Sequence, residues 1–556
     1  VLDHFNKTFD FAKSQMGSAQ EIALRLTPLK DVYYTHDTTF DFNPKGHRET
    51  NYVLLGIAFL ILFIAGINFT NLTTSLIPLR LKTINTHRVL GCSIYKLRAI
   101  SLIESIVICL ISYILALFIV NDLSYTPIAN WVDADIRLSQ YKGLILLTAL
   151  IAILTGCLAG LYPAIRSTSY APALVLKGSF GLSPKGKKVR VALIGFQYTV
   201  SIALIIVTLF MGLQNHFMTS SEQLGFNKDQ VAIVNLTPEI YAKHKPQYIQ
   251  KLKDYPGIED VAFSVYELSK EDDMIDLEYA RHEDKDVFFK VFYASENFLS
   301  VMDIQVEEGR DFTREDLNKA QSDYIINPAA ERDFHLHPGD RFNDRTVLGV
   351  SKDFRFNSCR IASSPFVFAL NNDIPNPKLV SYIRFNSKTN LQEAVAHVRE
   401  TLKEIDPTFP FEISFYNTIL NNLYQKEQTL GKLISLFGIM AILISIVGVF
   451  GLVLFETQYR RKEIGIRKIN GATTGQILLM FNKTYIRIVS VCFIISIPIA
   501  WMGTQQWLEN FAYKTPLHLW VFIVAFLIIL SVTIGTVTFR NWQAANENPV
   551  NSVKSE

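Results

Sequence analysis

Seven long apolar stretches alternate with polar segments along this chain of 556 residues. At a rise of about 1.5 Å per residue, each stretch can cross a hydrocarbon core of about 30 Å as an α-helix. The predicted spans are 53–77, 99–120, 144–165, 191–213, 431–456, 485–504 and 518–539. The pattern predicts a multi-pass α-helical membrane protein with one large soluble domain, at 218–429, between the fourth and fifth spans.

The pattern within 218–429 predicts an α+β domain. Runs rich in β-branched and aromatic residues predict strands at 230–236, 260–266, 286–294, 346–354, 378–385 and 411–416. Helical periodicity appears at Lys243–Tyr255, Asn327–Phe334 and Leu391–Ile405. This alternation predicts small split βαβ units packed side by side.

Helical periodicity continues beyond the membrane at both ends of this domain. It runs past Asn215 after the fourth span and past Leu423 before the fifth. Continuous helices there would form a stalk between membrane and soluble domain, with Asn215 and Leu423 close together.

One polar segment occurs twice at a constant offset, at Lys82–Leu97 and Lys462–Ile477. The matched pairs are Lys82 with Lys462, Ile84 with Ile464, Arg88 with Lys468, and Gly91 with Gly471. Each copy lies between two apolar stretches, so the chain is predicted to consist of two related membrane halves.

Charge distribution gives the orientation of the spans. Hydrophobic residues make up 49% of the chain and charged residues 19%, which is too many charges for a chain wholly inside a membrane. Lysine and arginine gather in the loops 79–98, 166–190 and 457–480. Because cytoplasmic loops carry the excess of basic residues, these loops are predicted to be cytoplasmic and the soluble domain to lie on the other side of the membrane. No nucleic-acid partner is expected.

This orientation places the first residues outside the membrane with no preceding span. We therefore expect an N-terminal span and most of a first domain outside the membrane to lie upstream, with 1–50 as the remnant of that domain. The other predicted domains are 51–166 (first membrane unit, with three spans), 167–190 (basic linker), 191–217 (span and stalk), 218–429 (core domain outside the membrane), 430–540 (second membrane unit, with three spans) and 541–556 (cytoplasmic tail).

Four sequence motifs resemble a known family. They are RRKEIGIRKINGATTGQIL after the fifth span, FQYTVSIALIIVTLFMGLQNHFM, GLYPAIRSTSYAPALVLKG, and IINPAAERDF followed by LGVSKDFRF. Together they resemble the FtsX-like/MacB family of ABC transporter permeases, most closely the form with two permease units in one polypeptide. The resemblance implies an inner-membrane permease subunit that is not itself an enzyme.

The resemblance also implies partners and a mechanism. Two cytosolic ABC ATPase subunits would bind ATP and Mg²⁺, so this chain would bind no cofactor of its own. Their hydrolysis would move the stalk and the periplasmic domain, which is mechanotransmission. A periplasmic adaptor or substrate protein and membrane lipid are the other expected partners.

The two repeated loops are the implied coupling sites. The residues concerned are Lys82, Ile84, His87, Arg88 and Gly91 in the first loop, and Lys462, Glu463, Ile464, Gly465, Arg467, Lys468 and Gly471 in the second. The first loop has lost part of the charged core of the second, so coupling is predicted to be asymmetric. The alternative is that both loops only anchor helix ends with positive charge, which explains the basic residues but not the shared isoleucine and glycine spacing.

Other candidate sites have simpler explanations. Gly181, Gly186 and Lys187 fit a phosphate-binding GxxxxGK, but Lys188 replaces the hydroxyl residue that would hold Mg²⁺. The pair His335 and His337 is expected to be an ordinary loop pair, and neither a metal site nor a catalytic residue is predicted.

Two features of the spans are expected to be structural. Glu104 is close enough to the end of the second span to reach the interface. In the fifth span, Ser445, Gly448 and Gly451 form a small-residue face that allows close helix packing.

Three functions remain open at this point. The chain is predicted to be a permease subunit that exports or acts on an envelope substrate, such as a peptide, antibiotic or lipoprotein. It could instead be a signalling permease that controls a cell-wall hydrolase or senses antimicrobial peptides. The third hypothesis, a membrane sensor or scaffold independent of ATPases, does not explain the repeated loops.

Overall fold

The computed structural model describes residues 26–34, 46, 48–131, 137–169, 184–220, 224–269, 276–283, 285–319, 321–355, 358–360, 362–370 and 379–546. Most of the predicted remnant 1–50, most of the basic linker 167–190 and most of the tail 541–556 lie outside these ranges, as does Gly181.

The chain divides into an N-terminal part, residues 1–60, and a main part, residues 61–556. In the N-terminal part the short helix α2 (Leu29–Val32) precedes the start of α3 (Arg48–Ser75). Arg48 pairs with Asp31, and its guanidinium lies 4.9 Å from the ring centroid of Tyr34. These contacts join α2 to the first turn of α3.

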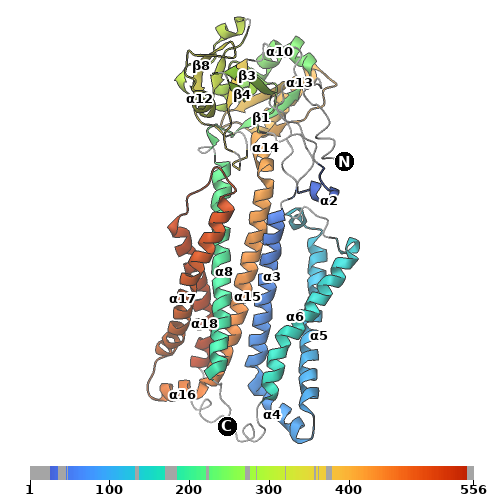
Figure 1. Ribbon diagram of the computed structural model, residues 1–556, viewed down its shortest axis with the longest axis vertical. Helices are drawn as coiled ribbons and strands as arrows, with labels where there is room; N and C mark the ends of the chain where they lie inside the picture. The colour runs from blue at the N-terminus through green and yellow to red at the C-terminus, as the bar shows by residue number, and fades with distance from the viewer. Residues whose placement is uncertain are drawn as a thin grey trace. The chain divides into compact units, whose positions relative to one another are not determined.

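Seven helices of the described residues are long and apolar enough to cross a membrane (Figure 1). They are α3, α5 (Ile94–Leu123), α6 (Lys142–Thr168), α8 (Pro184–Thr219), α15 (Gln425–Tyr459), α17 (Thr474–Leu508) and α18 (Leu519–Ala545). The predicted multi-pass architecture is confirmed. Because α8 begins at Pro184, Lys187 of the GxxxxGK match lies in a helix and not in a phosphate-binding loop.

Two helices begin earlier than the apolar pattern indicates. α5 begins at Ile94 and α17 at Thr474, where the apolar stretches begin near 99 and 485. The reason is capping: the side chains of Ser93 and Thr473 accept hydrogen bonds from backbone N–H groups of the first turns. A capped first turn remains helical outside the apolar stretch.

The helices of the second half form one packed bundle. α8 packs against α15, α17 and α18, and α17 packs against α18. Its core includes Tyr198, Ile206, Phe210, Val453 and Val489, each at most 3% exposed. In the first half α5 packs along α6, and the 3₁₀ turns Pro127–Trp131 and Leu138–Gln140 lie between these two helices. Short helices α4 (Ile77–Val89) and α16 (Arg461–Ile469) precede α5 and α17.

The soluble domain is built on one mixed sheet in the order β11-β1-β10-β2-β4-β9-β6-β8-β5, with β3 paired to β4 and β7 to β8. The strands are β1 (Val231–Leu236), β2 (Ile258–Ser264), β3 (Asp276–His282), β4 (Lys285–Ala294), β5 (Val306–Gly309), β6 (Tyr324–Ile326), β7 (Arg341–Phe342), β8 (Arg345–Ser351), β9 (Phe366–Leu370), β10 (Leu379–Phe385) and β11 (Ser414–Phe415). The helices are α10 (Pro238–Lys253), α11 (Phe298–Met302), α12 (Pro328–Phe334), α13 (Leu391–Ile405) and α14 (Tyr416–Leu423).

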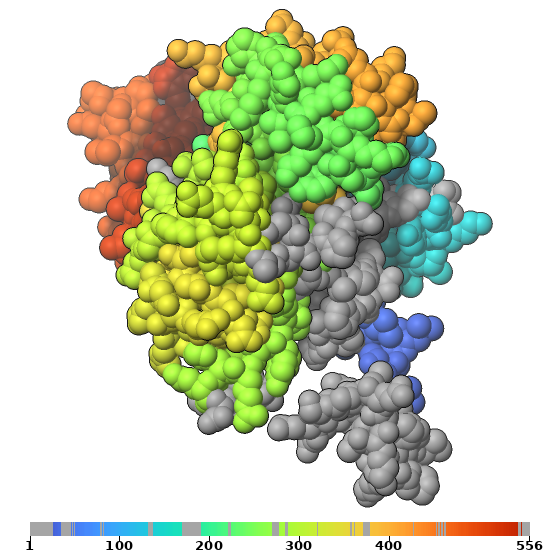
Figure 2. Space-filling model, turned by 90° about the horizontal axis from the view of Figure 1, so that it is seen from above, coloured from blue at the N-terminus to red at the C-terminus, as the bar shows by residue number. Residues whose placement is uncertain are grey.

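The predicted split βαβ units are present. β1 and β2, joined by α10, both pair antiparallel with β10, which lies between them. β10 and β11, joined by α13, both pair antiparallel with β1. The order β11-β1-β10-β2 is therefore ferredoxin-like, with β3 to β9 inserted between β2 and β10. Helices α10 and α13 pack side by side and appear as adjacent green and orange surfaces in Figure 2.

Buried clusters lie on both faces of this sheet. One joins strand residues such as Val234 and Ile383 to Leu252 of α10 and Val398 of α13. The other joins Ile233 and Val380 to α11 and α14. Neighbouring residues of one strand enter different clusters because side chains alternate between the faces.

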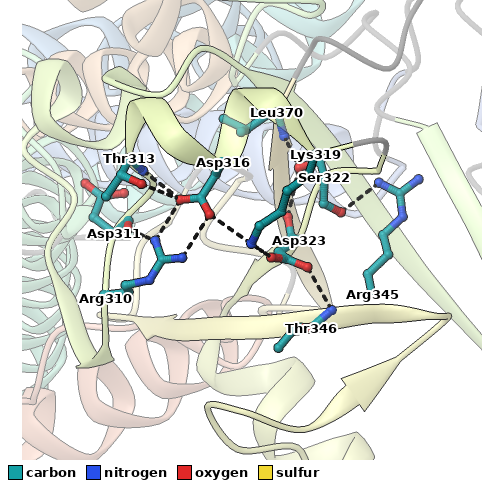
Figure 3. A network of polar contacts seen from close by, with 10 residues as sticks. All are labelled: Arg310, Asp311, Thr313, Asp316, Lys319, Ser322, Asp323, Arg345, Thr346 and Leu370. Carbon is teal, nitrogen blue, oxygen red and sulfur yellow. Dashed lines mark hydrogen bonds and ion pairs between the residues drawn. The ribbon is translucent and has the colours of Figure 1, made fainter.

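The carboxylate of Asp316 accepts several hydrogen bonds and holds together the connection from β5 to β6 (Figure 3). Asp316, 2% exposed, accepts hydrogen bonds from Arg310 (2.7 and 2.8 Å) and from the backbone N and Oγ1 of Thr313 (2.9 and 2.8 Å). Lys319 lies 3.0 Å from the same carboxylate and also pairs with Asp323. The hydrogen bond from Arg310 holds the pKa of Asp316 well below its usual value.

The stalk differs from the expectation of a continuous helix. α8 does extend beyond its apolar stretch to Thr219, but the second helix is interrupted at Tyr424, between α14 and α15. The ring of Tyr424 is 1% exposed and packs with Met218, Cys359 and Phe511. This packing accompanies the break in the helix.

Candidate functional site

The two repeated loops have the same backbone. Gly91 has φ +90° and Gly471 has φ +88°, a left-handed conformation that glycine adopts without strain. In the first loop Gly91 N donates to Arg88 O and the N of the next residue donates to His87 O, at 3.0 and 2.9 Å. Gly471 and Ala472 make the equivalent bonds at 3.0 and 2.9 Å. Each loop therefore ends its short helix in a Schellman turn.

Agreement between the loops extends to side-chain exposure. From 86 to 99 and from 466 to 479, each pair of equivalent positions has the same state: buried, half-buried or exposed. Leu97 and Ile477 are the buried members, at 8% and 3%. The repeat is thus a repeat of surface as well as of backbone.

The coupling residues predicted from the sequence occupy different environments. Ile464 is 4% exposed and belongs to the bundle core, whereas Ile84 is half-buried. His87, Arg467, Gly91 and Gly471 are exposed, Gly465 is buried, and Arg88, Glu463 and Lys468 are half-buried. The side chains of Lys82 and Lys462 lie outside the described residues.

Several of the charged groups have partners within the chain. Arg467 pairs with Glu463 at 2.7 Å, and Arg88 donates to the backbone oxygen of Thr168, at the end of α6, at 3.3 Å. Glu104 accepts two hydrogen bonds from Arg80, at 2.7 and 2.8 Å, so it ties α5 to α4. The structural role predicted for Glu104 agrees with this pair.

Sequence reasoning missed an exposed apolar residue in each loop. Val89 and Ile469 occupy equivalent positions, two residues before the turn glycine, and are 66% and 65% exposed. An apolar residue at the last helical position before a left-handed glycine, on a side of the membrane where basic residues dominate, is the signal that could have found them. The pair provides apolar contact area at the tip of each loop.

Residues 55–172 and 435–549 match the FtsX-like permease C-terminal family. Each match contains one of the two loops and the helices on either side. Both membrane halves of the chain therefore contain an FtsX-like permease domain. The seven apolar helices make the chain a multi-pass inner-membrane protein, and its sheet domain lies on the periplasmic side, opposite to the basic loops.

Curated relatives of this FtsX-like permease include two larger proteins. It is 25% identical over 212 residues, 36% of its own chain and 32% of the relative, to the macrolide export ATP-binding/permease protein MacB of Aggregatibacter actinomycetemcomitans. It is also 25% identical over 223 residues, 38% of its chain and 34% of the relative, to MacB of Neisseria gonorrhoeae. The matches span about a third of the length of these relatives.

Two solved structures resemble part of the permease. The periplasmic region of MacB from Actinobacillus actinomycetemcomitans covers 36% of this chain and 94% of its own, with 16% identity and a TM-score of 0.27. The extracellular domain of the transporter YknZ from Gram-positive bacteria covers 32% of this chain and 95% of its own, with 16% identity and a TM-score of 0.24.

The sheet domain of this permease touches the membrane helices through more than the stalk. Gln214 of α8 donates to Tyr513 O at 3.0 Å and accepts from Thr515 N at 2.8 Å, in the loop between α17 and α18. Tyr513 N donates to Cys359 O at 3.1 Å, and Ser363 N donates to the Tyr513 hydroxyl at 3.2 Å. The loop 509–518 thus joins α8 to the segment that precedes β9.

Aromatic and cationic side chains complete this junction. The Cys359 N–H donates to the Tyr424 hydroxyl at 3.2 Å, and burial raises the pKa of both the thiol and the phenol. The guanidinium of Arg360 stacks on Phe511 at 4.8 Å and pairs with Glu427 of α15 at 2.7 Å. One compact cluster therefore connects α8, α15, the α17–α18 loop and the sheet domain.

The predicted stalk contact is shifted along the helix. The Nδ2 of Asn215 would lie 3.0 Å from a Cβ placed on Gly431 of α15, so Asn215 packs against Gly431. Leu423 packs instead against the junction cluster around Tyr424 and against the sheet-domain cluster that includes α11 and α14.

The two histidines predicted to form a loop pair, His335 and His337, lie in different environments. His335 ends α12 in a left-handed conformation, whereas His337 comes together with Glu308 and Glu331, with ligand-type atoms within 4.8 Å of one another. His337 Nδ1 lies 3.7 Å from a Glu331 oxygen and its side chain is 69% exposed. Such exposure leaves these groups accessible to water.

Proposed function

We propose that this permease is the membrane subunit of an ABC transporter. Two separate cytosolic ATPase subunits, which bind ATP and Mg²⁺, dock on the loops 79–98 and 457–480. Nucleotide binding and hydrolysis there move the membrane helices and, through the junction, the periplasmic domain.

The observation that carries the proposal is the geometry that the two loops share at 86–99 and 466–479. Two segments 380 positions apart share a Schellman turn, a capped following helix and an exposed apolar residue at the tip. Anchoring a helix end in the interface requires only basic residues. A common backbone and a common apolar tip instead favour two copies of one docking partner.

A mechanical connection runs from the second loop to the periplasmic side. α17 begins directly after the turn at Gly471 and continues for 35 residues, which is about 52 Å. The loop that follows it carries the contacts of Tyr513 with Cys359 and Ser363. Movement of the turn would thus reach the sheet domain through one helix, alongside the stalk of α8 and α15.

The substrate is proposed only by class. The periplasmic domain would act on an envelope substrate such as a peptide, an antibiotic or a lipoprotein, with a periplasmic adaptor or substrate protein as its partner. The names of the relatives, which refer to macrolide export, favour export of an apolar molecule over a purely signalling role.

Docking can be tested with a charge at the tip of each loop. The permease is co-expressed with a candidate ABC ATPase subunit from the same genome, and the complex is purified through a tag on the permease. Ile469→Asp and Val89→Asp should each reduce ATPase recovery on the order of tenfold, because a buried unpaired carboxylate opposes docking. The double variant should abolish recovery.

A matched control separates docking from general damage. Leu277 of β3 is 63% exposed, on the other side of the membrane, so Leu277→Asp makes the same chemical change at similar exposure. It should leave ATPase recovery unchanged. Normal recovery with the double loop variant would show that the loops do not dock an ATPase.

A further inference from the structure

The repeat offset that relates the loops also relates the helices before them. Moved by 380 positions, α3 falls on α15, so that Asn68 corresponds to Gly448 and Asn71 to Gly451. At these two equivalent positions the first half has asparagine where the second half has glycine. Asn68 and Asn71 are 5% and 7% exposed, and both glycines are buried.

Asn68 lies against its own counterpart. Its Nδ2 donates to Ile444 O of α15 at 2.6 Å. A Cβ placed on Gly448 would lie 2.8 Å from Asn68 Cγ and 3.0 Å from its Nδ2, so the space that a side chain would need at 448 is filled by Asn68. Leu72, one turn along α3, covers Gly451 in the same way, 3.1 Å from its Cβ position to Leu72 Cγ.

Contact between equivalent residues has a geometric meaning. When two similar units pack around a two-fold axis, a residue meets its own equivalent only where the axis passes. The crossing of α3 and α15 at Asn68 and Gly448 therefore marks the pseudo-two-fold axis that relates the halves. Small residues at such a crossing allow helices to approach closely within a membrane.

Because the two residues at this axis differ in size, pairing of α3 with α15 differs in its packing from pairing of two copies of either helix. Two copies of α3 would bring asparagine against asparagine, where the structure has room for one side chain. Two copies of α15 would bring glycine against glycine, which allows close approach but lacks the hydrogen bond that the Asn68 amide donates to Ile444 O. The Asn–Gly pair fits only α3 against α15.

We infer that Asn68 and Gly448 are specificity-determining residues that pair the first half with the second half of the same chain. The inference does not depend on ATPase docking.

Disulfide trapping tests which chain supplies each residue. Asn68→Cys and Gly448→Cys are combined in the full chain, with a protease site inserted between 170 and 183. After oxidation in the membrane and cleavage, the double variant should run as one full-length species without reductant and as two fragments with reductant, because the two Cβ positions are within disulfide reach. Each single variant controls for bonds to native cysteines.

Two differently tagged chains, each with one of the two cysteines, are co-expressed in parallel. No linked pair is expected between them. Linkage between the tagged chains, or absence of the bond in the double variant, would overturn the inference.

Exchanging the large and the small residue between the two positions tests specificity. The test uses the full chain with the inserted protease site, after cleavage into its two halves. Gly448→Asn alone should lower co-elution of the two halves on the order of tenfold, as expected for overpacking by one side chain. Adding Asn68→Gly should restore co-elution, because the large and small residues have only changed places. If the exchanged pair is no better than the single variant, the pair does not determine specificity.

Discussion

The turn glycine of the second loop offers a test in which the backbone alone is perturbed. Gly471 has φ +88°, and a Cβ placed on it would meet no atom within 4 Å. A side chain there therefore encounters open space, and its cost comes from the left-handed conformation. Substitution by Asn, Ala and Val forms a series in which that cost rises.

The magnitudes follow from the conformation. Alanine in the left-handed region costs about 1–2 kcal/mol, a factor of about 5–30 in the population of the native turn. Asparagine tolerates this region and replaces glycine at many helix ends, so its cost is smaller. Valine, which is β-branched, is an outlier there and should cost the most. The rest of the fold should persist, because Ile464 and Ile477 stay anchored in the bundle core.

The assay is ATP hydrolysis by the co-purified complex, with ATPase recovery measured separately. We expect activity to fall in the order Gly, Asn, Ala, Val, and the same order at Gly91, which has φ +90° and equally open surroundings. Gly475 is exposed within the first turn of α17 and has no positive φ, so Gly475→Ala is the matched control and should be neutral. Equal activity for the Gly471→Asn and Gly471→Val variants would refute the role of the turn geometry.

Three further predictions concern the periplasmic side. Asp316→Asn should destabilise the sheet domain by about 2 kcal/mol. This cost is smaller than for a fully buried ion pair, because Arg310 is half exposed and water screens its charge. The pKa of Asp316 is lower in the folded than in the unfolded protein, so the extra stability of the wild type over Asp316→Asn should be complete at neutral pH and should decrease as pH falls below about 4. Thermal unfolding of both proteins measures this difference, and a difference that does not change with pH would contradict the reasoning. Tyr424→Phe should leave a buried N–H unpaired at a cost of about 1–3 kcal/mol, seen as faster hydrogen exchange in 358–370, and unchanged exchange would argue against the junction. Cysteines at Asn215 and Gly431 should form a stalk disulfide more readily than cysteines at 215 and 423, and the reverse preference would contradict the observed helix contact.

Much of the architecture could be predicted from the order of the residues. A membrane span must be long, apolar and internally hydrogen-bonded, so composition over about 20 residues suffices to recognise it. The repeat at Lys82 and Lys462 showed two halves, and the glycines within it end both short helices in the same turn. Strands such as β1 and β10 followed from their local pattern. β9 was missed, because its five buried residues form a continuous apolar run that shows no alternation.

Contacts between distant segments were decided by the tertiary structure. Helical periodicity runs through Tyr424, yet the helix breaks there, where the ring is buried beside Cys359 and Phe511. The exposure of Val89 and Ile469 depends on which faces of α4 and α16 meet the bundle. The small-residue face at Gly448 was visible in the sequence, but its partner Asn68 was not. A sequence records which side chains a helix presents, whereas the partner that each one meets depends on the packing of segments that are far apart along the chain.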